Sequence, residues 1–280
     1  YSLGEDSIPD CPISPHSPQL HREKNYGPRW PVNACVARPV GKKEIAMEPE
    51  AQKAMQKEID RLRKKGVWDE CHPREWDEVR RESTRTGQAV HMGYVFGICV
   101  QKNSELDDKD PGKKYKGRYV FQGNRVVDQN YNAAIFQDLG SQPATMEASR
   151  AADYYGCAPG HTLHVADAEQ AYVQAPMKGT PTWVAIPDEA IPPNLRAKYK
   201  SMRRPVCRMI YSLYGHPDAG TNWAEFVDGG IRRAGFDQIS KEWPSCYFHS
   251  RLRLMLVVYV DDFKLAGPQQ NMAEVWKLLR

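Results

Sequence analysis

The chain has 280 residues, and its hydrophobic fraction of 41% suffices to bury the core of one large domain or two modest ones. Its longest apolar run, residues 252–260, is interrupted by Arg253 and falls short of the roughly 20 residues of a membrane-spanning helix, so no membrane partner is predicted. The net charge is only +4, and the seven cysteines contain no C-x-x-C pair, which gives no indication of a zinc or redox motif and favours reduced thiols.

The predicted elements begin after a proline-rich stretch, residues 1–45, which we interpret as a leader or linker. A helix is predicted from Glu50 to a stop at Gly66. Its apolar residues recur at spacings of four, four and three and therefore share one face: Ala51, Met55, Ile59 and Leu62. Residues 69–89 are highly charged and mixed in composition, so no regular element is predicted there.

Two strands of a hairpin are predicted next, at residues 93–100 and 115–121, because both segments are rich in aromatic and β-branched side chains. The returning strand carries a basic cluster, residues 112–126, and a second basic cluster occupies residues 196–208; neither contains an acid. Such clusters are typical of polyanion-binding surfaces and equally of solvated faces without a partner. Charge alone does not decide between these two interpretations.

The second half of the chain predicts a helix over residues 144–155 and an alternating strand over residues 161–167 that ends at Asp167. A further amphipathic helix is predicted from a cap at Thr221 to a stop at Gly235.

A hairpin with acids at its tip is predicted near the end of the sequence. Residues 252–260 have the length and β-branched content of a buried strand, and Asp261, Asp262 and a returning strand follow. Asn271 and Glu274 have the spacing of a capping box that opens a last helix.

Carboxylates thus follow two predicted strands, at Asp167 and at Asp261 with Asp262. Two-metal phosphoryl transfer needs such ligands, because Mg²⁺ prefers oxygen and keeps water and substrate phosphates as its other ligands. Turn chemistry alone also accounts for an isolated Asp-Asp pair. The surrounding sequence favours the metal site.

The segment Tyr259-Val260-Asp261-Asp262 resembles the YxDD box of reverse transcriptases, and residues 167–172, D-A-E-Q-A-Y, resemble the D-x-x-x-A-[FY] motif of the same family. Three further segments are similar to the Ty1/copia branch of retrotransposon polyproteins. They are residues 114–123, which resemble R-Y-K-A-R-L-V-A-K-G, then Glu58, Leu62 and Trp68, and finally Leu213-Tyr214-Gly215 with Trp223, which resemble L-Y-G-L-K-Q-A-P-R-x-W. The sequence departs from that branch at residues 217–221 and at Gln122, where the branch carries basic side chains.

This resemblance implies an α+β right-hand polymerase fold with an antiparallel palm sheet and packed helices. The fingers would occupy residues 46–140 and 179–215, and the palm residues 141–178 and 216–280, with the thumb absent. The implied activity is that of an RNA-directed DNA polymerase, a nucleotidyltransferase that adds dNTPs to a primer 3′-hydroxyl on an RNA or DNA template.

The resemblance also assigns roles to individual residues. Asp167, Asp261 and Asp262 are the implied catalytic ligands of two Mg²⁺ ions, with Mn²⁺ as a possible substitute, and Tyr259 and Val260 are structural at the site. In addition, the family's pattern implies that Lys116 and Arg118 grip the triphosphate of the dNTP and that Tyr172 excludes ribonucleotides.

The family places a thumb and an RNase H part downstream, so we expect both to follow Arg280 in a longer polyprotein, and activity of the isolated piece stays open. The expected location is intracellular, in a cytoplasmic retroelement particle or in the nucleus. One alternative is a catalytically inactive remnant that binds nucleic acid or a protein. Another is a nucleotide cyclase or a different palm-fold transferase, which explains neither the basic hairpin nor Tyr172.

Overall fold

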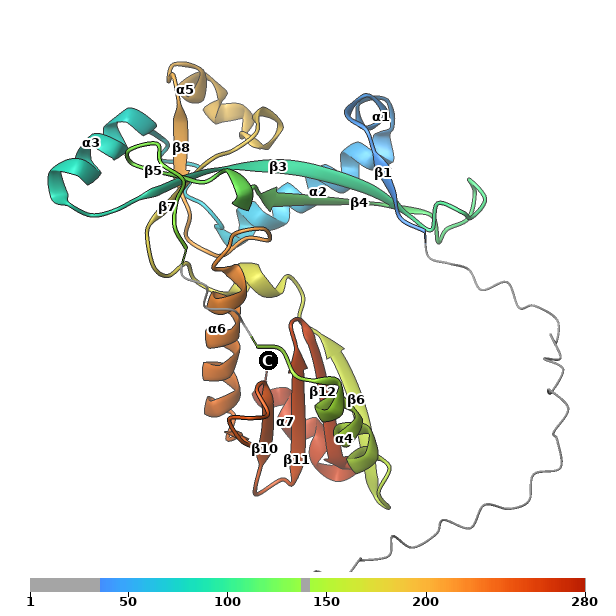
Figure 1. Cartoon of the computed structure of the whole chain (residues 1–280). Helices are drawn as coiled ribbons and strands as arrows, with labels where there is room; N and C mark the ends of the chain where they lie inside the picture. Colours follow the sequence, from blue (N-terminus) through green and yellow to red (C-terminus); the bar gives the residue numbers. More distant parts are fainter. Residues whose placement is uncertain (1–35, 137–141, 280) are drawn as a thin grey trace, which may run out of the picture.

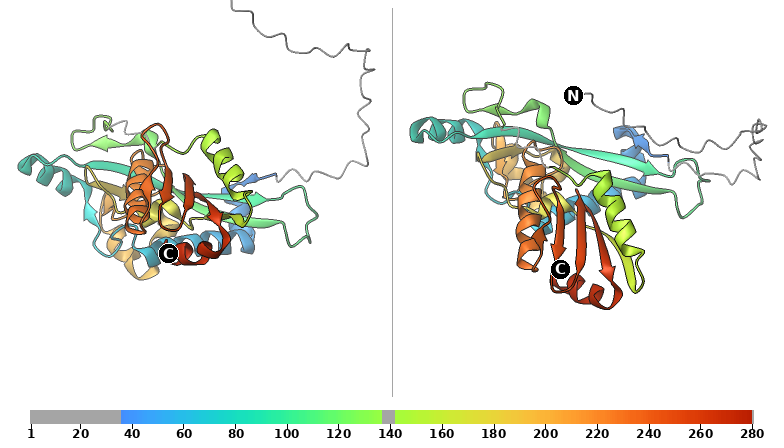
Figure 2. Two further views of the ribbon diagram at one scale, coloured as in Figure 1. Left: turned by 90° about the horizontal axis from the view of Figure 1, so that it is seen from below. Right: turned by 60° about the horizontal axis from the view of Figure 1, so that its bottom comes forward.

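The computed structural model describes residues 36–136 and 142–279. Within these ranges the chain forms two β-sheets, one of seven strands and one of five, with α-helices packed on both. The two sheets belong to two bodies that lie one above the other, and the chain passes between them more than once (Figures 1 and 2). This arrangement confirms an α+β protein with antiparallel sheets, apart from one parallel pair of strands in the larger sheet.

The seven-stranded sheet is organised by its longest strand, β3 (His91–Lys102). Its other strands are β1 (Arg38–Val40), β2 (Arg74–Glu75), β4 (Lys114–Phe121), β5 (Val127–Asp128), β7 (Thr182–Ala185) and β8 (Pro205–Arg208). β3 pairs antiparallel with β1, β4 and β5 and parallel with β7, which continues through β8 to β2. The predicted hairpin is therefore confirmed as β3 and β4.

Helix α2 (Pro49–Lys65) covers one face of this hairpin. Its buried residues are those predicted from their spacing, and Gly66 ends it in the left-handed conformation that favours glycine, with φ of 71°. Gly117 of β4 allows the close packing, because a Cβ there would lie 2.7 Å from the carbonyl oxygen of Ala54. Lys116 and Arg118, its neighbours in β4, consequently point to the opposite face.

Regular structure also occurs where the sequence predicted none. β1 and α1 (Lys42–Met47) lie partly within the predicted leader, so the folded part begins before residue 45, while residues 1–35 lie outside the described part. Helix α3 (Trp76–Thr86) lies in the segment interpreted as irregular, and its buried face is Trp76, Val79 and Ser83. A short helix, α5 (Arg196–Lys200), begins the second basic cluster.

The five-stranded sheet is antiparallel throughout, in the order β6-β12-β11-β10-β9. Its strands are β6 (His161–Asp167), β9 (Asp237–Gln238), β10 (Cys246–His249), β11 (Leu254–Tyr259) and β12 (Asp262–Pro268). The strand that ends at Asp167 and the hairpin with acids at its tip are both as predicted.

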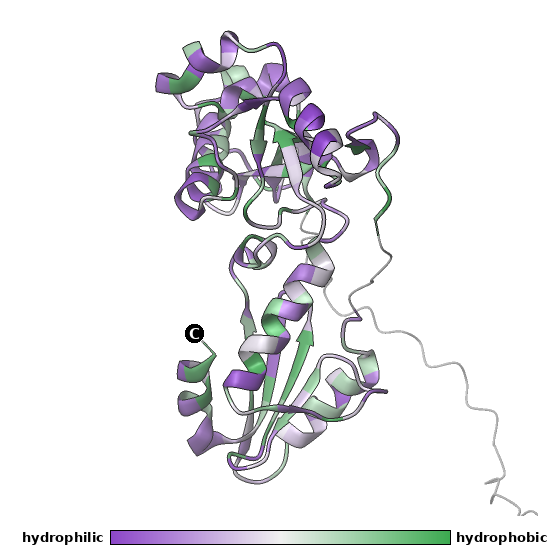
Figure 3. Cartoon of the chain, turned by 90° about the vertical axis from the view of Figure 1, so that its left-hand side faces the viewer, coloured by the Kyte–Doolittle hydropathy of each residue, from purple (hydrophilic) through white to green (hydrophobic). Residues whose placement is uncertain are grey.

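Helices cover both faces of this sheet, which explains why β11 reads as a continuous apolar run. Helix α4 (Met146–Gly156) packs on Met255 and Val257, while α6 (Ala219–Arg233) and α7 (Met272–Leu278) pack on the intervening side chains Leu254, Leu256 and Val258. The strands are coloured as hydrophobic in Figure 3. No helix in the described part of the chain combines the length and the apolarity needed to cross a membrane.

One predicted cap is wrong, and a second is right in position but lacks its predicted hydrogen bonds. α6 begins at Ala219 with Asp218 as its N-cap residue, so Thr221 lies inside the first turn. The earlier start is fixed by a local turn in which the amide of Ala219 donates to the carbonyl of His216. Asn271 is the N-cap residue of α7 as predicted, but the capping box does not form, because the side-chain amide of Asn271 donates to the Leu252 carbonyl and Glu274 pairs with Arg251.

Candidate active site

Two carboxylates face each other across neighbouring strands of the five-stranded sheet. β6 ends at Asp167 and β12 begins at Asp262, and the antiparallel register pairs these two residues directly. Side chains of directly opposed residues project from the same face, with Cβ atoms about 4.5–5.5 Å apart. The register therefore places two acids, far apart in the chain, side by side at one end of the sheet.

The third predicted acid lies in the turn between β11 and β12. The carbonyl of Asp261 accepts a hydrogen bond from the amide of Ala168 at 2.7 Å, which ties the turn to the end of β6. Val260 has a positive φ of 56° at the bend, and Tyr259 at the end of β11 pairs with Asp262. The structure thus brings together all five residues that the sequence assigned to this end of the sheet.

None of the three acids forms an ion pair within residues 36–136 and 142–279. Lys264 shares a face of β12 with Asp262, but its ammonium group binds Ser149 and Asp153 on α4. Like charges directly opposite each other destabilise a sheet. The register thus sets two carboxylates without an ion-pair partner opposite each other, and no group of three metal-ligating side chains is preassembled in the described ranges.

The basic hairpin carries two charged side chains on one face. Lys116 and Arg118 lie opposite Val100 and Ile98 of β3, on the face that α2 leaves open. Burial and the charges of Arg118 and Lys102 lower the pKa of Lys116, and the carboxylates of Glu58 and Asp167 oppose that shift. Of the three acids, Asp167 is the one whose charge acts on the pKa of Lys116.

Two tyrosines connect the hairpin with the acid turn. Tyr172, in the 3-10 turn Ala171–Gln174 that follows β6, meets Tyr214 edge to face with ring centroids 4.9 Å apart. The Arg118 guanidinium lies 5.9 Å from the centroid of the Tyr214 ring. Burial first, and then the charge of Asp261, raises the pKa of Tyr172, so the phenol stays protonated beside the acid.

The position of Tyr214 is fixed by a close backbone approach. Its carbonyl accepts a hydrogen bond from the amide of Phe121 at 2.8 Å. The next residue is Gly215, with φ of 88°, and a Cβ at that residue would lie 2.2 Å from the Phe121 carbonyl oxygen. The Leu-Tyr-Gly segment therefore needs its glycine in order to lay Tyr214 against β4.

Sequence reasoning assigned no role to two acids at the same junction. Glu58 of α2 is half-buried, and burial raises its pKa against the opposing charges of Arg61, Lys116 and Arg118. Glu169, two residues after Asp167, forms an ion pair with Arg61 of α2. The helical position of Glu58, one residue before the buried Ile59, did not indicate that Glu58 would lie near the cations of the hairpin. That proximity depends on how α2 packs against β4.

The open face of the hairpin also carries exposed apolar and aromatic side chains, namely Tyr94, Phe96 and Ile98. Phe96 and Ile98 lie opposite Val120 and Arg118, and the Arg125 guanidinium lies 5.9 Å from the centroid of the Tyr94 ring. Aromatic rings interleaved with cations are the surface on which nucleic-acid bases stack while phosphates are held. Helix α5, which begins the second basic cluster, belongs to the same body as the hairpin and lies on the side away from the five-stranded sheet (Figure 1).

Comparison with known proteins gives no family for this chain: no family model matches it, and no curated protein matches it. The chemistry of the site therefore has to be argued from its own residues.

Proposed function

We propose that the chain is the fingers and palm part of an RNA-directed DNA polymerase of the Ty1/copia reverse-transcriptase kind. The seven-stranded body would be the fingers and the five-stranded body the palm. One observation carries the proposal: Asp167 and Asp262 are paired in register at the end of a sheet, with Asp261 beside them. The substrates would be dNTPs, a primer and an RNA or DNA template, and a thumb and an RNase H part would complete the enzyme.

The donor set fits the two magnesium ions of nucleotidyl transfer. Asp167, Asp261 and Asp262 offer only oxygen, which Mg²⁺ prefers, and Mg²⁺ needs few protein ligands because it keeps water and substrate phosphates. When bound, such ions activate the attacking hydroxyl and neutralise the charge on the phosphates. Mn²⁺ is expected to substitute, since it accepts the same ligands.

The chain's own side chains account for the other needs of the reaction. Lys116 and Arg118 supply charge-assisted hydrogen bonds to a triphosphate, with Arg118 held over Tyr214. Tyr172 lies at the start of a turn directly after the acid strand, where its half-buried ring would contact the sugar and exclude a 2′-hydroxyl. Tyr94 and Phe96 offer rings on which template bases would stack.

The test is primer extension on an RNA template with Mg²⁺, using this chain joined to its natural downstream sequence. Asp261→Asn should lower synthesis by about 100-fold or more, a typical cost of losing one electrostatic contact to a transition state. The matched control is Asp237→Asn, the same change at an exposed acid of β9 at the far edge of the same sheet, which should keep wild-type synthesis.

Equal synthesis by wild type and Asp261→Asn would remove the assignment of the site. A second candidate function, binding without catalysis, rests on the open basic and aromatic face of the hairpin, which requires no metal. That candidate would be preferred if the wild-type protein bound primer and template tightly and extended nothing.

A further inference from the structure

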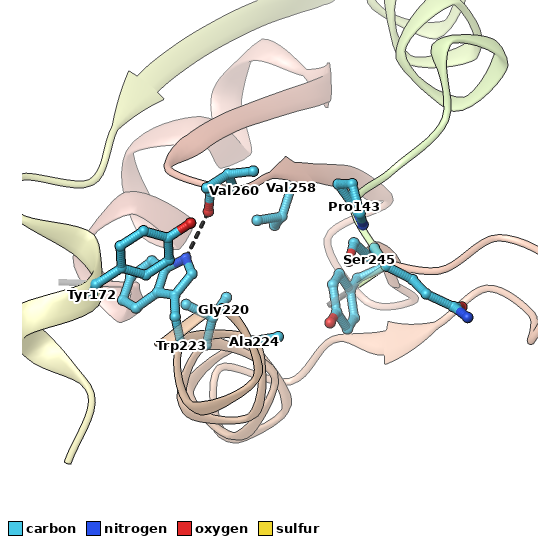
Figure 4. Close-up of a pocket in the computed structure, with 11 residues that line it drawn as sticks. Pro143, Tyr172, Gly220, Trp223, Ala224, Ser245, Val258 and Val260 are labelled. Carbon is cyan, nitrogen blue, oxygen red and sulfur yellow. Dashed lines mark hydrogen bonds between the residues drawn. The ribbon is translucent and has the colours of Figure 1, made fainter. Parts of the chain in front are cut away.

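The turn that carries Asp261 is held from below by a side chain of another element. The indole Nε1–H of Trp223, on α6, donates to the backbone carbonyl of Val260 at 2.7 Å, as the dashed line in Figure 4 shows. Trp223 is buried, and the two residues are 37 positions apart in the chain. The hydrogen bond joins the first half of α6 to the bend of the acid hairpin.

Val260 needs such a restraint because its conformation is unfavourable. Its φ of 56° lies in the left-handed region, which is a genuine outlier for a β-branched residue. Residues held there persist only where their surroundings over-determine the backbone. A relaxed Val260 would return to negative φ, which would rotate the following peptide and with it Asp261.

The surroundings of Val260 supply two fixed points, at its own carbonyl and at the next one. The carbonyl of Val260 is fixed by Trp223, and the next carbonyl, that of Asp261, is fixed by the amide of Ala168 beside Asp167. Val260, Trp223 and Tyr172 also line one small cavity, so the indole lies directly under the turn (Figure 4). Of the two hydrogen bonds, only the one from Trp223 comes from a side chain and can be removed by substitution.

We propose that Trp223 is a positioning residue that locks Val260 in the left-handed conformation and thereby holds Asp261 beside Asp167. The catalytic consequence rests on the proposed polymerase function, whereas the structural consequence does not. A buried tryptophan usually finds an acceptor for its N–H. The alternative is therefore that Trp223 only fills space and satisfies its own indole.

Two substitutions separate the lock from simple packing. Trp223→Phe keeps an aromatic ring in the cavity and removes the N–H donor. Val260→Gly removes the need for a lock, because glycine adopts positive φ without strain. The matched control is Trp276→Phe, the same change on α7, where the indole donates to the His164 ring outside the turn.

If the lock is real, Trp223→Phe lowers kcat in primer extension by about 10-fold, the cost of one buried hydrogen bond, and leaves the KM for dNTP unchanged. In a Val260→Gly background the same substitution should cost less than about 3-fold, since the strain is gone. Trp276→Phe should stay within about 2-fold of wild type, as expected away from the site. Equal losses from Trp223→Phe in both backgrounds would show that the tryptophan only packs.

A second readout does not depend on catalysis. In thermal denaturation, Trp223→Phe should lower the midpoint clearly in the wild-type background and by less than half as much beside Val260→Gly. If the wild-type protein makes no DNA while this coupling is found, the polymerase proposal fails and the lock stands. If the protein polymerises and the two substitutions lower the midpoint independently, the lock fails and the polymerase proposal stands.

Discussion

Gly117→Ala perturbs the hairpin at the one residue between its two proposed phosphate-binding cations. A Cβ on Gly117 would lie 2.7 Å from the carbonyl oxygen of Ala54, 2.8 Å from the Cα of Met55 and 2.9 Å from its Sδ. Two of these three atoms belong to the backbone of α2 and cannot move aside by a change of rotamer. The new methyl group must therefore push β4 away from α2.

The size of the effect follows from two opposing contributions. Overpacking a tight contact costs about 1–3 kcal/mol. Replacing glycine also restricts the unfolded chain, which returns about 0.4–1 kcal/mol. The net loss of stability is expected to be about 1–2 kcal/mol, or roughly 2–8 °C in the midpoint for a chain of this size.

Gly230→Ala is the matched control, because the same methyl group there is expected to act in the opposite direction. Gly230 lies inside α6, and the nearest atom to its added Cβ is the Nη2 of Arg233 at 3.9 Å, an ordinary contact. Alanine in a helix interior is more stable than glycine by about 0.5–1 kcal/mol. Thermal denaturation followed by circular dichroism compares the two variants with wild type. A Gly117→Ala midpoint equal to or above that of wild type would refute the close-packing argument.

Three further outcomes are expected. Tyr172→Ala should raise kcat/KM for ribonucleotides relative to deoxynucleotides, and an unchanged ratio would show that Tyr172 does not select the sugar. Arg118→Ala should raise the KM for dNTP by about 10-fold or more, the value of a hydrogen bond to a charged group, whereas the exposed Arg81→Ala on α3 should not. His216→Leu should reduce the loss of unfolding free energy that occurs at acid pH. Burial lowers the pKa of His216 to about 4 in the folded protein, so the unfolded chain takes up a proton first as the pH falls. The free energy of unfolding therefore decreases between pH 6.5 and 4, by on the order of 3 kcal/mol. Urea denaturation of both proteins at pH 7 and 4.5 measures the difference.

The pH argument for His216 rests on its contacts as well as on burial. Its Nδ1 accepts a hydrogen bond from the amide of Asp218 and so carries no proton, while its Nε2 lies 3.2 Å from the hydroxyl of Thr182. His91 has its own pKa lowered by burial, and its charge lowers the pKa of His216 further. An equal loss of unfolding free energy at acid pH in His216→Leu and wild type would contradict the assignment to this histidine.

Hydrophobic periodicity predicted those elements whose buried face shows as a regular spacing of apolar residues within the element itself. The spacing of Ala51, Met55, Ile59 and Leu62 gave α2 to within one residue at each end, and alternation gave β6 with its end at Asp167. Helix α3 was not predicted because its apolar face is short and mixed. Trp76 and Val79 are buried by residues brought from elsewhere, among them Met92 and Val206, which a local pattern does not contain.

The candidate site was predictable in its residue types but not in its register. Motif resemblance singled out Asp167, Asp261 and Asp262, yet only the pairing of β6 with β12 shows that Asp262, rather than Asp261, lies directly opposite Asp167. The partnership of Tyr214 with Arg118 was likewise hidden, since it arises where a loop meets β4 almost a hundred residues away in the chain. Local patterns carry no information on such long-range contacts.

The contacts that join the two bodies lie close to the proposed chemistry, which bears on how the site would assemble. The Arg61 and Glu169 pair links α2 to the loop after the acid strand, but both side chains are largely exposed, and such pairs contribute only about 0–1 kcal/mol. The edge-to-face contact of Tyr172 with Tyr214 adds about 0.5–1.5 kcal/mol. Hydrogen bonds from Lys116 and Arg118 to a triphosphate are worth about 1.5–3 kcal/mol each. Since the ligand contacts outweigh the junction contacts, the spacing between the basic hairpin and the acids is expected to be set by the bound nucleotide rather than by the protein alone.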